Sequence, residues 1–405
     1  MIDLRAARND PTGTRAALAR KGAGPAFDAL MAADEAWRAL IPGVDTLRSR
    51  AKLKGKPTPE QLEELTVVKA ELQALEARLA AAEAERDRLL DFVPNLPHLS
   101  APDGGEDDFV VLREVGTIPE LAGPKEHTEL GRFDMERAAR LSGARFGYTM
   151  GAAALLQLAV FQLAISRLAG KGYTPVLPPV LVREEAMYGT GFLPTDAANL
   201  YKLETDELYL TGTSEVALAG IHMGEILSAD ELPARYSGWS TCFRREAGAA
   251  GKDTRGMFRL HQFDKIEMFV FCRPEESYAE HNAVLANEEE LLQALELPYR
   301  VILTAAGDLG ASAAKKYDCE AWFPAQGRYR EVTSASNTTD FQARRLGIRF
   351  RGEKGVEPLH TLNGTAVTGR AVMAVLENHQ QPDGSVNVPE ALWAYGAPRV
   401  IEPGA

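Results

Sequence analysis

The chain has 405 residues, of which 45% are hydrophobic and 25% charged, and its formal net charge is −12 at pH 7. This length allows two or three domains, and the composition is typical of a globular protein rather than a disordered or fibrous one. The acidic balance excludes general affinity for nucleic acid, so any RNA contact needs a local basic patch. The three cysteines are too widely spaced for a disulfide framework or a structural zinc site, and we expect a reducing, cytoplasmic location.

Residues 27–92 carry hydrophobic side chains at alternating spacings of three and four, the pattern of helices that pack along a heptad seam. The pattern covers residues 30–47 and then residues 65–89, where only Arg86 breaks it. It predicts two antiparallel helices that form a long coiled-coil arm. Because proline removes a backbone hydrogen bond, we expect a kink or local break of the first helix near Pro42.

The predicted tip of this arm is basic. Five cations lie there without an intervening acid, namely Arg48, Arg50, Lys52, Lys54 and Lys56. On an acidic protein such a patch is a candidate contact for RNA phosphates. A solvated loop with incidental charge is the alternative.

Three prolines followed by GGEDD predict a linker near residues 94–108. We therefore expect an N-terminal domain over residues 1–105 and a second domain over residues 106–405. In the second domain the helical patterns are 133–141, 150–169, 275–296 and 369–379, and the strand-like runs are 173–182, 208–213, 239–246, 257–272, 299–304, 329–334 and 357–363. Neighbouring strands joined as hairpins favour an antiparallel sheet flanked by helices, so the predicted fold class is α+β.

Residues 149–166 contain no charge over 18 positions, the lower limit for a helix that spans a membrane. Gln157 and Gln162 lie in the middle of this segment, and alanine and glycine dilute its hydrophobicity. We expect a buried helix or a helix at a subunit interface, and no membrane span. The first residues, MIDLRAARND, lack the apolar core of a secretory signal.

Residues 243–267, FRREAGAAGKDTRGMFRLHQFDKIE, predict two strands joined by a glycine-punctuated loop. Strand alternation puts Arg244 and Glu246 on one face of the first strand. On the second strand one face carries His261, Phe263, Lys265 and Glu267. An arginine can bind an anion bidentately, and a phenylalanine ring can stack on a base. A charged, solvated hairpin face is the alternative.

This hairpin closely resembles the second signature motif of class II aminoacyl-tRNA synthetases, in its seryl-tRNA synthetase form. The resemblance extends over essentially the whole chain, including the arm. Residues 150–182 resemble motif 1, LTGTSEVAL at 210–218 resembles the serine-binding segment, and HTLNGTAVTGRAVMAVLENHQ at 360–380 resembles motif 3. The resemblance implies a class II catalytic domain and a homodimer formed through the helix and strand near residues 150–182.

The resemblance also implies the residues that bind serine, which are Thr213, Glu215, Arg244, Glu267 and Thr365. Taken alone, a threonine and a glutamate at the spacing of the first two are more often a helix N-cap.

For ATP, the resemblance implies contacts through residues of motif 2, of YREVTSASNTTDFQARR at 329–345, and of motif 3. These residues are Arg244, Arg245, Glu246, Phe263, Glu331, Val332, Thr333, Ser334 and Arg370. The oxygen donors Glu331 and Ser334 are implied to hold Mg²⁺, and no zinc is expected. The implied catalytic residues are Arg244, Glu267 and Arg370, although Arg370 alone reads equally well as a surface helix residue.

The implied reaction is ATP-dependent ligation of L-serine to the 3′ end of tRNA(Ser) through seryl-adenylate, with release of AMP and diphosphate. Serylation of tRNA(Sec), where that RNA is present, is implied as well. One alternative is a related ligase that loads an amino acid onto a carrier protein, but such relatives lack the arm and hold zinc. A second is a non-catalytic coiled-coil binding protein with an inactive synthetase body.

Overall fold

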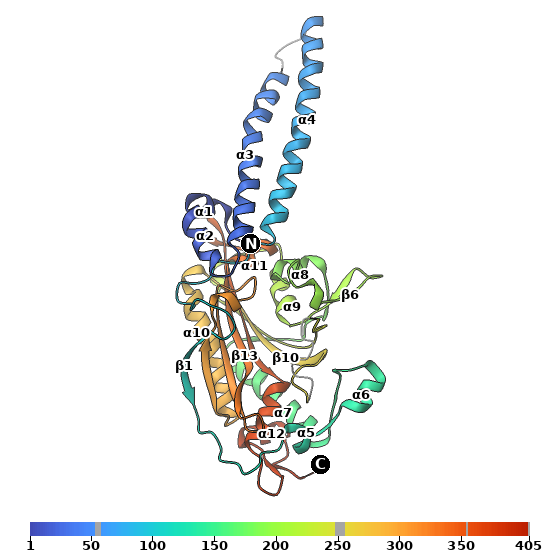
Figure 1. Ribbon diagram of the computed structural model, residues 1–405, viewed down its shortest axis with the longest axis vertical. Helices are drawn as coiled ribbons and strands as arrows, with labels where there is room; N and C mark the ends of the chain where they lie inside the picture. Colours follow the sequence, from blue (N-terminus) through green and yellow to red (C-terminus); the bar gives the residue numbers. More distant parts are fainter. Residues whose placement is uncertain (53–57, 248–255, 354, 404–405) are drawn as a thin grey trace. The chain divides into compact units, whose positions relative to one another are not determined.

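The structure, a computed structural model, describes residues 1–52, 58–247, 256–353 and 355–403. It divides into two compact units, Met1–Leu96 and Pro97–Ala405. The described part of the first unit is helical, and the second unit combines a large sheet with helices (Figure 1).

The first unit is built from short helices at its base and two long helices. They are α1 (Leu4–Asn9), α2 (Pro11–Ala19), α3 (Gly24–Ala51) and α4 (Pro59–Leu90). Thr58 caps α4 through a capping box with Gln61, which satisfies backbone N–H groups at its first turn. Phe27, Leu90 and Val93 belong to a buried cluster at the base.

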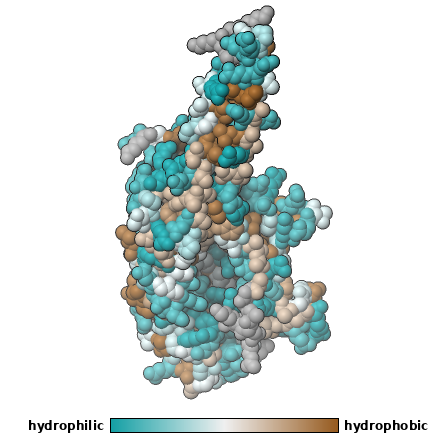
Figure 2. Space-filling view, turned by 45° about the horizontal axis from the view of Figure 1, so that its top comes forward, coloured by the Kyte–Doolittle hydropathy of each residue, from teal (hydrophilic) through white to brown (hydrophobic). Residues whose placement is uncertain are grey.

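The predicted heptad seam is confirmed, because its residues are the ones that α3 and α4 protect from solvent. Val44 and Val68 are buried in it, and Figure 2 shows hydrophobic residues along the arm among hydrophilic ones. The break at Arg86 is only apparent. The Arg86 guanidinium lies 4.0 Å from the centre of the Trp37 ring, so this cation packs within the seam.

Of the kink or local break expected near Pro42, the break is wrong, since α3 continues through Pro42 as one helix, and the kink stays a prediction. The side chain of Pro42 is exposed, whereas Leu40, Val44 and Leu47 around it remain protected in the seam. Packing along the seam therefore holds the helix together although one backbone hydrogen bond is lost.

The large sheet of the second unit runs in the order β1-β11-β12-β13-β16-β10-β9-β4. Its neighbouring strands are antiparallel apart from β4 and β9, which confirms the predicted antiparallel character. The strands are β1 (Val110–Val115), β4 (Thr174–Val176), β9 (Ala234–Phe243), β10 (Gln262–Cys272), β11 (Tyr299–Leu303), β12 (Lys315–Phe323), β13 (Arg328–Thr339) and β16 (His360–Thr368).

Short strands form small sheets beside the large one. They are β2 (Arg132–Asp134) with β3 (Tyr148–Met150), β5 (Leu181–Arg183) with β6 (Tyr201–Leu203) and β7 (Leu208–Leu210), β8 (Ile226–Ser228) with β14 (Arg349–Gly352) and β15 (Gly355–Pro358), and β17 (Val386–Asn387) with β18 (Val400–Ile401). The run 173–182, expected as one strand, is thus two strands in different sheets, β4 and β5.

The helices of the second unit are α5 (His127–Leu130), α6 (Met135–Ser142), α7 (Gly151–Gly170), α8 (Glu184–Thr190), α9 (Glu215–Ala219), α10 (Ser277–Ala294), α11 (Phe341–Leu346) and α12 (Gly369–Asn378). Side chains of α7, α10 and α12 share the main core with Ile266 and Met268 of β10. On the opposite face of β10, Phe269 and Phe271 pack with residues of α9 and α11. That cluster covers one end of this face, and the site described below lies at the other.

The uncharged segment forms α7, which is long and apolar enough to cross a membrane by length and composition alone. One side of α7 is buried in the main core through residues such as Leu156 and Leu163. Leu155 and Leu158 are about half exposed on its other side. The expected burial of this helix is thus confirmed on one side only, and its place at a subunit interface stays a prediction.

We predict that Arg86→Ala loosens the arm, because the contact between Arg86 and Trp37 is worth about 0.5–1 kcal/mol at a partly exposed site. Amide hydrogen exchange, measured by mass spectrometry, should become faster in α3 and α4 and stay unchanged in the second unit. Arg88→Ala is the matched control, since Arg88 is exposed and pairs only with Glu85 among the described side chains. Equal protection in Arg86→Ala and the unaltered chain would contradict the role of this contact.

Candidate active site

A cavity of about 1000 Å³ opens on the face of the sheet that carries Phe263 and Lys265. Residues of β10, β12, β13, β16 and the start of α12 line it. Most of the predicted ATP residues lie on its wall, namely Arg244, Glu246, Phe263, Glu331, Val332, Ser334 and Arg370. Thr365 also lines it, so the cavity brings together residues more than a hundred positions apart in the sequence.

A β-bulge in β13 decides which of its residues face this cavity. Thr333 pairs with Cys319 and Glu331 pairs with Glu320, so β13 has one extra residue, Val332, at this point. Glu331 and Ser334 therefore lie on the same side of the sheet although they are three residues apart. Thr333 faces the other way, and its hydroxyl donates to Glu288 Oε2 at 2.8 Å in the core.

A second bulge, in β16, decides which of its residues lie opposite Lys265 and Glu267 of β10. Ile266 pairs with Val367 and Glu267 pairs with Thr365, which leaves Ala366 as the extra residue of β16. As a result Thr365 lies directly opposite Glu267, and Thr368 lies opposite Lys265. Strict alternation would have kept Thr365 and Thr368 on opposite faces.

A buried polar cluster beside the cavity is formed by four side chains, those of Thr213, Lys265, Glu267 and Thr365. Glu267 is 2% exposed and ion-pairs with Lys265. Its Oε2 also accepts from the hydroxyls of Thr213 and Thr365, each at 3.4 Å. The Lys265 ammonium further lies 3.5 Å from the Thr365 hydroxyl. This cluster can offer a small polar ligand a carboxylate, hydroxyls and an ammonium within one pocket.

Thr213 and Glu215 do not lie on a strand. Glu215 begins α9 after the N-cap residue Ser214, and its backbone N–H donates to the Thr213 hydroxyl at 3.2 Å. Thr213 therefore bonds the first turn of α9 without being its N-cap residue, and the same threonine reaches Glu267.

The carboxylate of Glu215 is buried beside the cluster. It accepts hydrogen bonds from Gln342 Nε2 at 2.7 Å and from Asn363 Nδ2 at 2.9 Å. Burial, together with the nearby charge of Glu267, raises the pKa of Glu215 to about 7. Glu215 can therefore change its charge near neutral pH, and a cation bound beside it would favour the ionised form.

Arg244 and Phe263 lie side by side at the cavity wall. The Arg244 guanidinium is 5.2 Å from the centre of the Phe263 ring, and Arg244 Nε donates to the carbonyl of Gly212 at 3.1 Å. These contacts orient a cation and an aromatic face toward the same space. A planar ring and an anionic group of one ligand can therefore bind together there.

The first strand of the motif ends earlier than expected. β9 stops at Phe243, so Arg244 and Glu246 follow the strand instead of sharing one of its faces. Glu246 adopts a left-handed φ of 52° and accepts from Arg259 Nε at 2.5 Å. Arg245 is exposed outside the cavity lining, and its backbone N–H donates to the carbonyl of Asn199 at 2.9 Å.

Strand β12 adds polar residues that the sequence analysis missed. Lys316 and Asp318 line the cavity, 3.0 Å apart, opposite the bulged part of β13. Burial raises the pKa of Asp318 although Lys316 opposes this shift. The alternation of Lys316, Asp318 and Glu320 with Tyr317 and Cys319 is a strand signal that could have identified this edge.

Arg370 begins α12 and contacts Glu331. Its Nη1 donates to the Glu331 carbonyl at 2.9 Å and lies 3.8 Å from the Glu331 carboxylate. Desolvation within the cavity would raise the pKa of Glu331, whose side chain is 48% exposed, but Arg370 and Lys316 outweigh it and hold that pKa below its ordinary value. Glu331 is therefore an anion flanked by cations, in keeping with a site for a charged ligand and its counterion.

The oxygen atoms of Glu331 and Ser334 fit a magnesium ion that takes most of its ligands from phosphates and water. Glu331 and Ser334 supply hard oxygen donors on the cavity side of β13. The neighbouring Asp318 Oδ1 is buried and has no hydrogen-bond partner among the residues that the structure describes. Among the described residues, no group of three or more His, Cys, Asp and Glu side chains could hold a metal by itself.

At the arm tip the structure describes Arg48, Arg50 and Lys52, whereas Lys54 and Lys56 lie outside the described residues. Arg48 pairs with Glu76 at 2.9 Å and Arg50 pairs with Glu64 at 3.2 Å. Lys52 is exposed. The predicted patch is thus partly neutralised by acids of α4.

Two family models and a curated relative match the chain. Residues 1–97 match the model of the seryl-tRNA synthetase N-terminal domain, and residues 201–379 match the class II tRNA synthetase core domain for G, H, P, S and T. The chain is 52% identical over 417 residues to a serine–tRNA ligase of Mycolicibacterium vanbaalenii, with 100% of both chains covered.

Two solved structures are similar over nearly the full length. A seryl-tRNA synthetase from Pyrococcus horikoshii complexed with ATP matches with a TM-score of 0.94 and 40% identity, covering 100% of both chains. A cytoplasmic serine–tRNA ligase from Naegleria fowleri in complex with AMP matches with a TM-score of 0.89 and 34% identity, covering 98% of this chain and 96% of the other.

The raised pKa of Glu215 predicts a pH-dependent stability. The ordinary pKa is 4.5 and the folded-state value is about 7, so between these values the folded chain binds more protons than the unfolded one. Stability contributed by this group is therefore lost as the pH rises through that window. Glu215→Gln mimics the protonated form. Its effect on the free energy of unfolding, relative to the unaltered chain, should be more stabilising at pH 8 than at pH 5 by about 2 kcal/mol.

Urea unfolding of both proteins at pH 5 and pH 8 measures this difference. Glu204→Gln is the matched control, because the Glu204 side chain is 83% exposed and should give the same change at both pH values. A pH-independent effect of Glu215→Gln would show that Glu215 is ionised throughout this range.

Proposed function

The chain belongs to the seryl-tRNA synthetase family, and from that premise we propose that it ligates L-serine to the 3′ end of tRNA(Ser) in two ATP-dependent steps. In the first step the serine carboxylate attacks the α-phosphorus of ATP, which forms seryl-adenylate and releases diphosphate. In the second a terminal ribose hydroxyl of tRNA attacks the acyl carbon and releases AMP. The same chemistry would serylate tRNA(Sec) where that RNA is present.

The observation that carries this proposal is the adjacency of two ligand surfaces. Arg244 and Phe263 form a cationic and aromatic wall, and the buried cluster around Glu267 lies on the same strand, β10. Adenine would stack on Phe263 while Arg244 contacts both the α-phosphate and the serine carboxylate. A ligand held in both places has its carboxylate beside the phosphorus that it attacks.

Serine would be selected by the buried cluster. Its hydroxyl would donate to Glu267 and accept from Thr365, and its ammonium would lie near Thr213 and the carboxylate of Glu215. Alanine would leave these buried groups unpaired, an arrangement that rejects an analogue lacking the hydroxyl by about 10⁴-fold. Threonine adds a methyl group, which must be excluded by the fit of the pocket.

The triphosphate would extend from Arg244 toward Glu331, Ser334 and Arg370. Glu246 and the backbone near Val332 and Thr333 would border the nucleotide. A magnesium ion held by Glu331 and Ser334 would neutralise phosphate charge and make diphosphate a better leaving group. Arg370, at the first turn of α12, would contact the γ-phosphate and keep that end of the chain in place.

Two further parts of the proposal concern partners. The arm of the first unit would contact tRNA through its backbone and shape, with Arg48, Arg50 and Lys52 near phosphates. The half-exposed Leu155 and Leu158 of α7 support a homodimer formed through α7 and the following strand. With tRNA as its substrate, the enzyme would act in the cytoplasm.

The carrier-protein alternative receives less support, because such ligases lack a long arm whereas this chain has α3 and α4. The match of residues 1–97 to the N-terminal domain of seryl-tRNA synthetases adds to this argument. The inactive-body alternative receives less support as well, because a serine–tRNA ligase matches the chain over its full length and the cavity retains Arg244, Phe263 and Glu331.

We expect the unaltered chain to catalyse ATP–pyrophosphate exchange that serine stimulates and that alanine and threonine do not. Glu267→Ala should lower the serine-dependent rate by about 10³-fold or more, because the serine hydroxyl loses its charged partner and Lys265 is left buried and unpaired. Glu204→Ala is the control and should retain the rate. Near-normal exchange in Glu267→Ala would contradict the role of Glu267, and no exchange by the unaltered chain would favour the inactive-body alternative.

The arm can be tested separately from serine activation. Replacing residues 41–79 by a short glycine–serine linker retains Phe27, Leu30 and Leu90 of the base cluster. Serine-dependent exchange should stay unchanged, whereas charging of tRNA(Ser), measured with labelled serine, should fall by about 100-fold or more because the RNA loses its positioning contacts. Normal charging by the shortened chain would show that the arm has no role in tRNA binding.

A further inference from the structure

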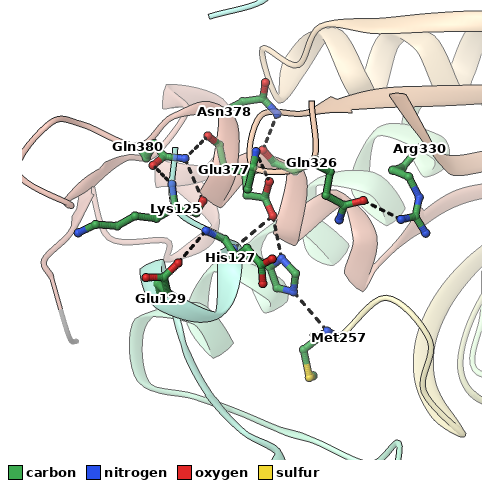
Figure 3. A network of polar contacts seen from close by, with 12 residues as sticks. Lys125, His127, Glu129, Met257, Gln326, Arg330, Glu377, Asn378 and Gln380 are labelled. Carbon is green, nitrogen blue, oxygen red and sulfur yellow. Dashed lines mark hydrogen bonds and ion pairs between the residues drawn. The ribbon is translucent and has the colours of Figure 1, made fainter. Parts of the chain in front are cut away.

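A buried histidine–glutamate pair lies behind the cavity wall, where α5, α12 and residues 256–260 meet (Figure 3). His127 is 2% exposed and Glu377 is completely buried. His127 Nδ1 lies 2.8 Å from Glu377 Oε1. None of the roles proposed above uses either residue, and neither was a candidate from the sequence.

The carboxylate of Glu377 joins separate parts of the chain. Its Oε1 accepts from the backbone N–H and from Nδ1 of His127, at 3.2 and 2.8 Å. Its Oε2 accepts from the backbone N–H of Ala325, in the turn between β12 and β13, at 3.2 Å. A buried carboxylate needs several such donors, so α5, α12 and this turn are held at one point.

The other ring nitrogen of His127 supports the cavity wall. His127 Nε2 accepts from the backbone N–H of Met257 at 3.2 Å. A backbone N–H can only donate, so Nε2 must be unprotonated, and the proton of the neutral ring lies on Nδ1, facing Glu377. One neutral tautomer therefore satisfies both partners.

Residues 257–260 form part of the cavity lining and lead directly into β10. The ring of Phe258 stands edge-on to His127 at 5.3 Å, and Arg259 binds Glu246. A Cβ on Gly256, whose φ is +70°, would lie 2.9 Å from His127 Nε2. This close approach requires glycine at position 256 and keeps the histidine against the backbone.

The same pair reaches the triphosphate end of the cavity through α12. Glu377 and Arg370 lie on one helix, separated by about two turns. His127 therefore links the wall segment that precedes Phe263 to the helix that carries Arg370.

We propose that His127 is a positioning residue for ATP, acting through Met257 on one side and through Glu377 on the other. The inference rests on the proposed function, since it assigns the cavity to ATP. The wall segment is held so that Arg259 and Glu246 meet beside the nucleotide. The serine cluster of Thr213, Glu267 and Thr365 makes no contact with His127 among the described interactions, so serine binding is independent of this anchor.

Two substitutions separate the two bonds of His127. In His127→Asn the amide nitrogen can still donate to Glu377, but no atom reaches the N–H of Met257. In His127→Gln the longer side chain can present its amide oxygen to Met257 and restore the anchor. KM values for ATP and for serine are measured in serine-dependent exchange, and binding of ATP alone is measured by calorimetry.

The expected result is that His127→Asn raises the KM and the Kd for ATP by about 10-fold, the effect of one buried hydrogen bond. Its KM for serine should stay within about twofold, and His127→Gln should return the ATP values to within about threefold of the unaltered chain. An unchanged KM for ATP in His127→Asn overturns the proposal. A parallel rise of both KM values in both variants overturns it as well, because it indicates a general loss of structure.

If His127→Asn does not fold, Glu377→Gln serves as the second variant. Its amide oxygen can accept from His127, but its amide nitrogen cannot accept from Ala325, so the anchor is weakened without loss of the histidine. The KM for ATP should then rise by about threefold, and an unchanged value overturns the proposal. If the unaltered chain neither binds ATP nor catalyses the exchange, the proposed function itself fails.

Discussion

Two β-bulges decide which side chains meet in the cavity, and the rest of the site depends on them. One extra residue in β13, Val332, turns Glu331 and Ser334 to the same side of the sheet. One extra residue in β16, Ala366, sets Thr365 against Glu267. A strand of strict alternation could not present residues three apart on one face, so both bulges convert a continuous sheet into a site with two subsites.

The two subsites, the pocket around Glu267 and the wall with Arg244, differ in their exposure to solvent, and this difference decides which ligand groups each can bind. The side chains around Glu267 are buried and their charges are paired with one another, so a ligand must offer matching groups. The wall with Arg244, Phe263 and Arg370 remains more open, as suits a ligand that carries its own charge and counterions. The network around His127 belongs to neither subsite, yet it holds the wall segment that leads into β10. Rigid support behind a more accessible wall is how a sheet can bind a large polar ligand in one orientation.

The sequence predicted those elements in which a regular spacing of apolar residues places one side against the core. The heptad spacing identified both arm helices, and alternation placed Phe263, Lys265 and Glu267 on one face. The bulges could not be predicted, because Val332 and Ala366 are apolar residues that fit an ordinary strand. Strand β12 was missed although its charged residues alternate with the buried Tyr317 and Cys319, and only the structure shows that its charged side, with Lys316 and Asp318, lines a cavity. The resemblance to a family supplied Glu331 and Ser334, and only the structure gives the reason for their spacing.

The ion pairs at the arm tip have a consequence for the thermodynamics of RNA binding. Arg48 and Arg50 already have carboxylate partners, Glu76 and Glu64, in the chain without RNA. A phosphate that binds either arginine competes with a carboxylate, and a carboxylate that is displaced has to be solvated or attract a cation from solution. Cation uptake by the protein would offset part of the counterion release from RNA. The salt dependence of binding would therefore be shallower than a count of the basic residues suggests, and geometry would contribute more than charge to the choice of RNA.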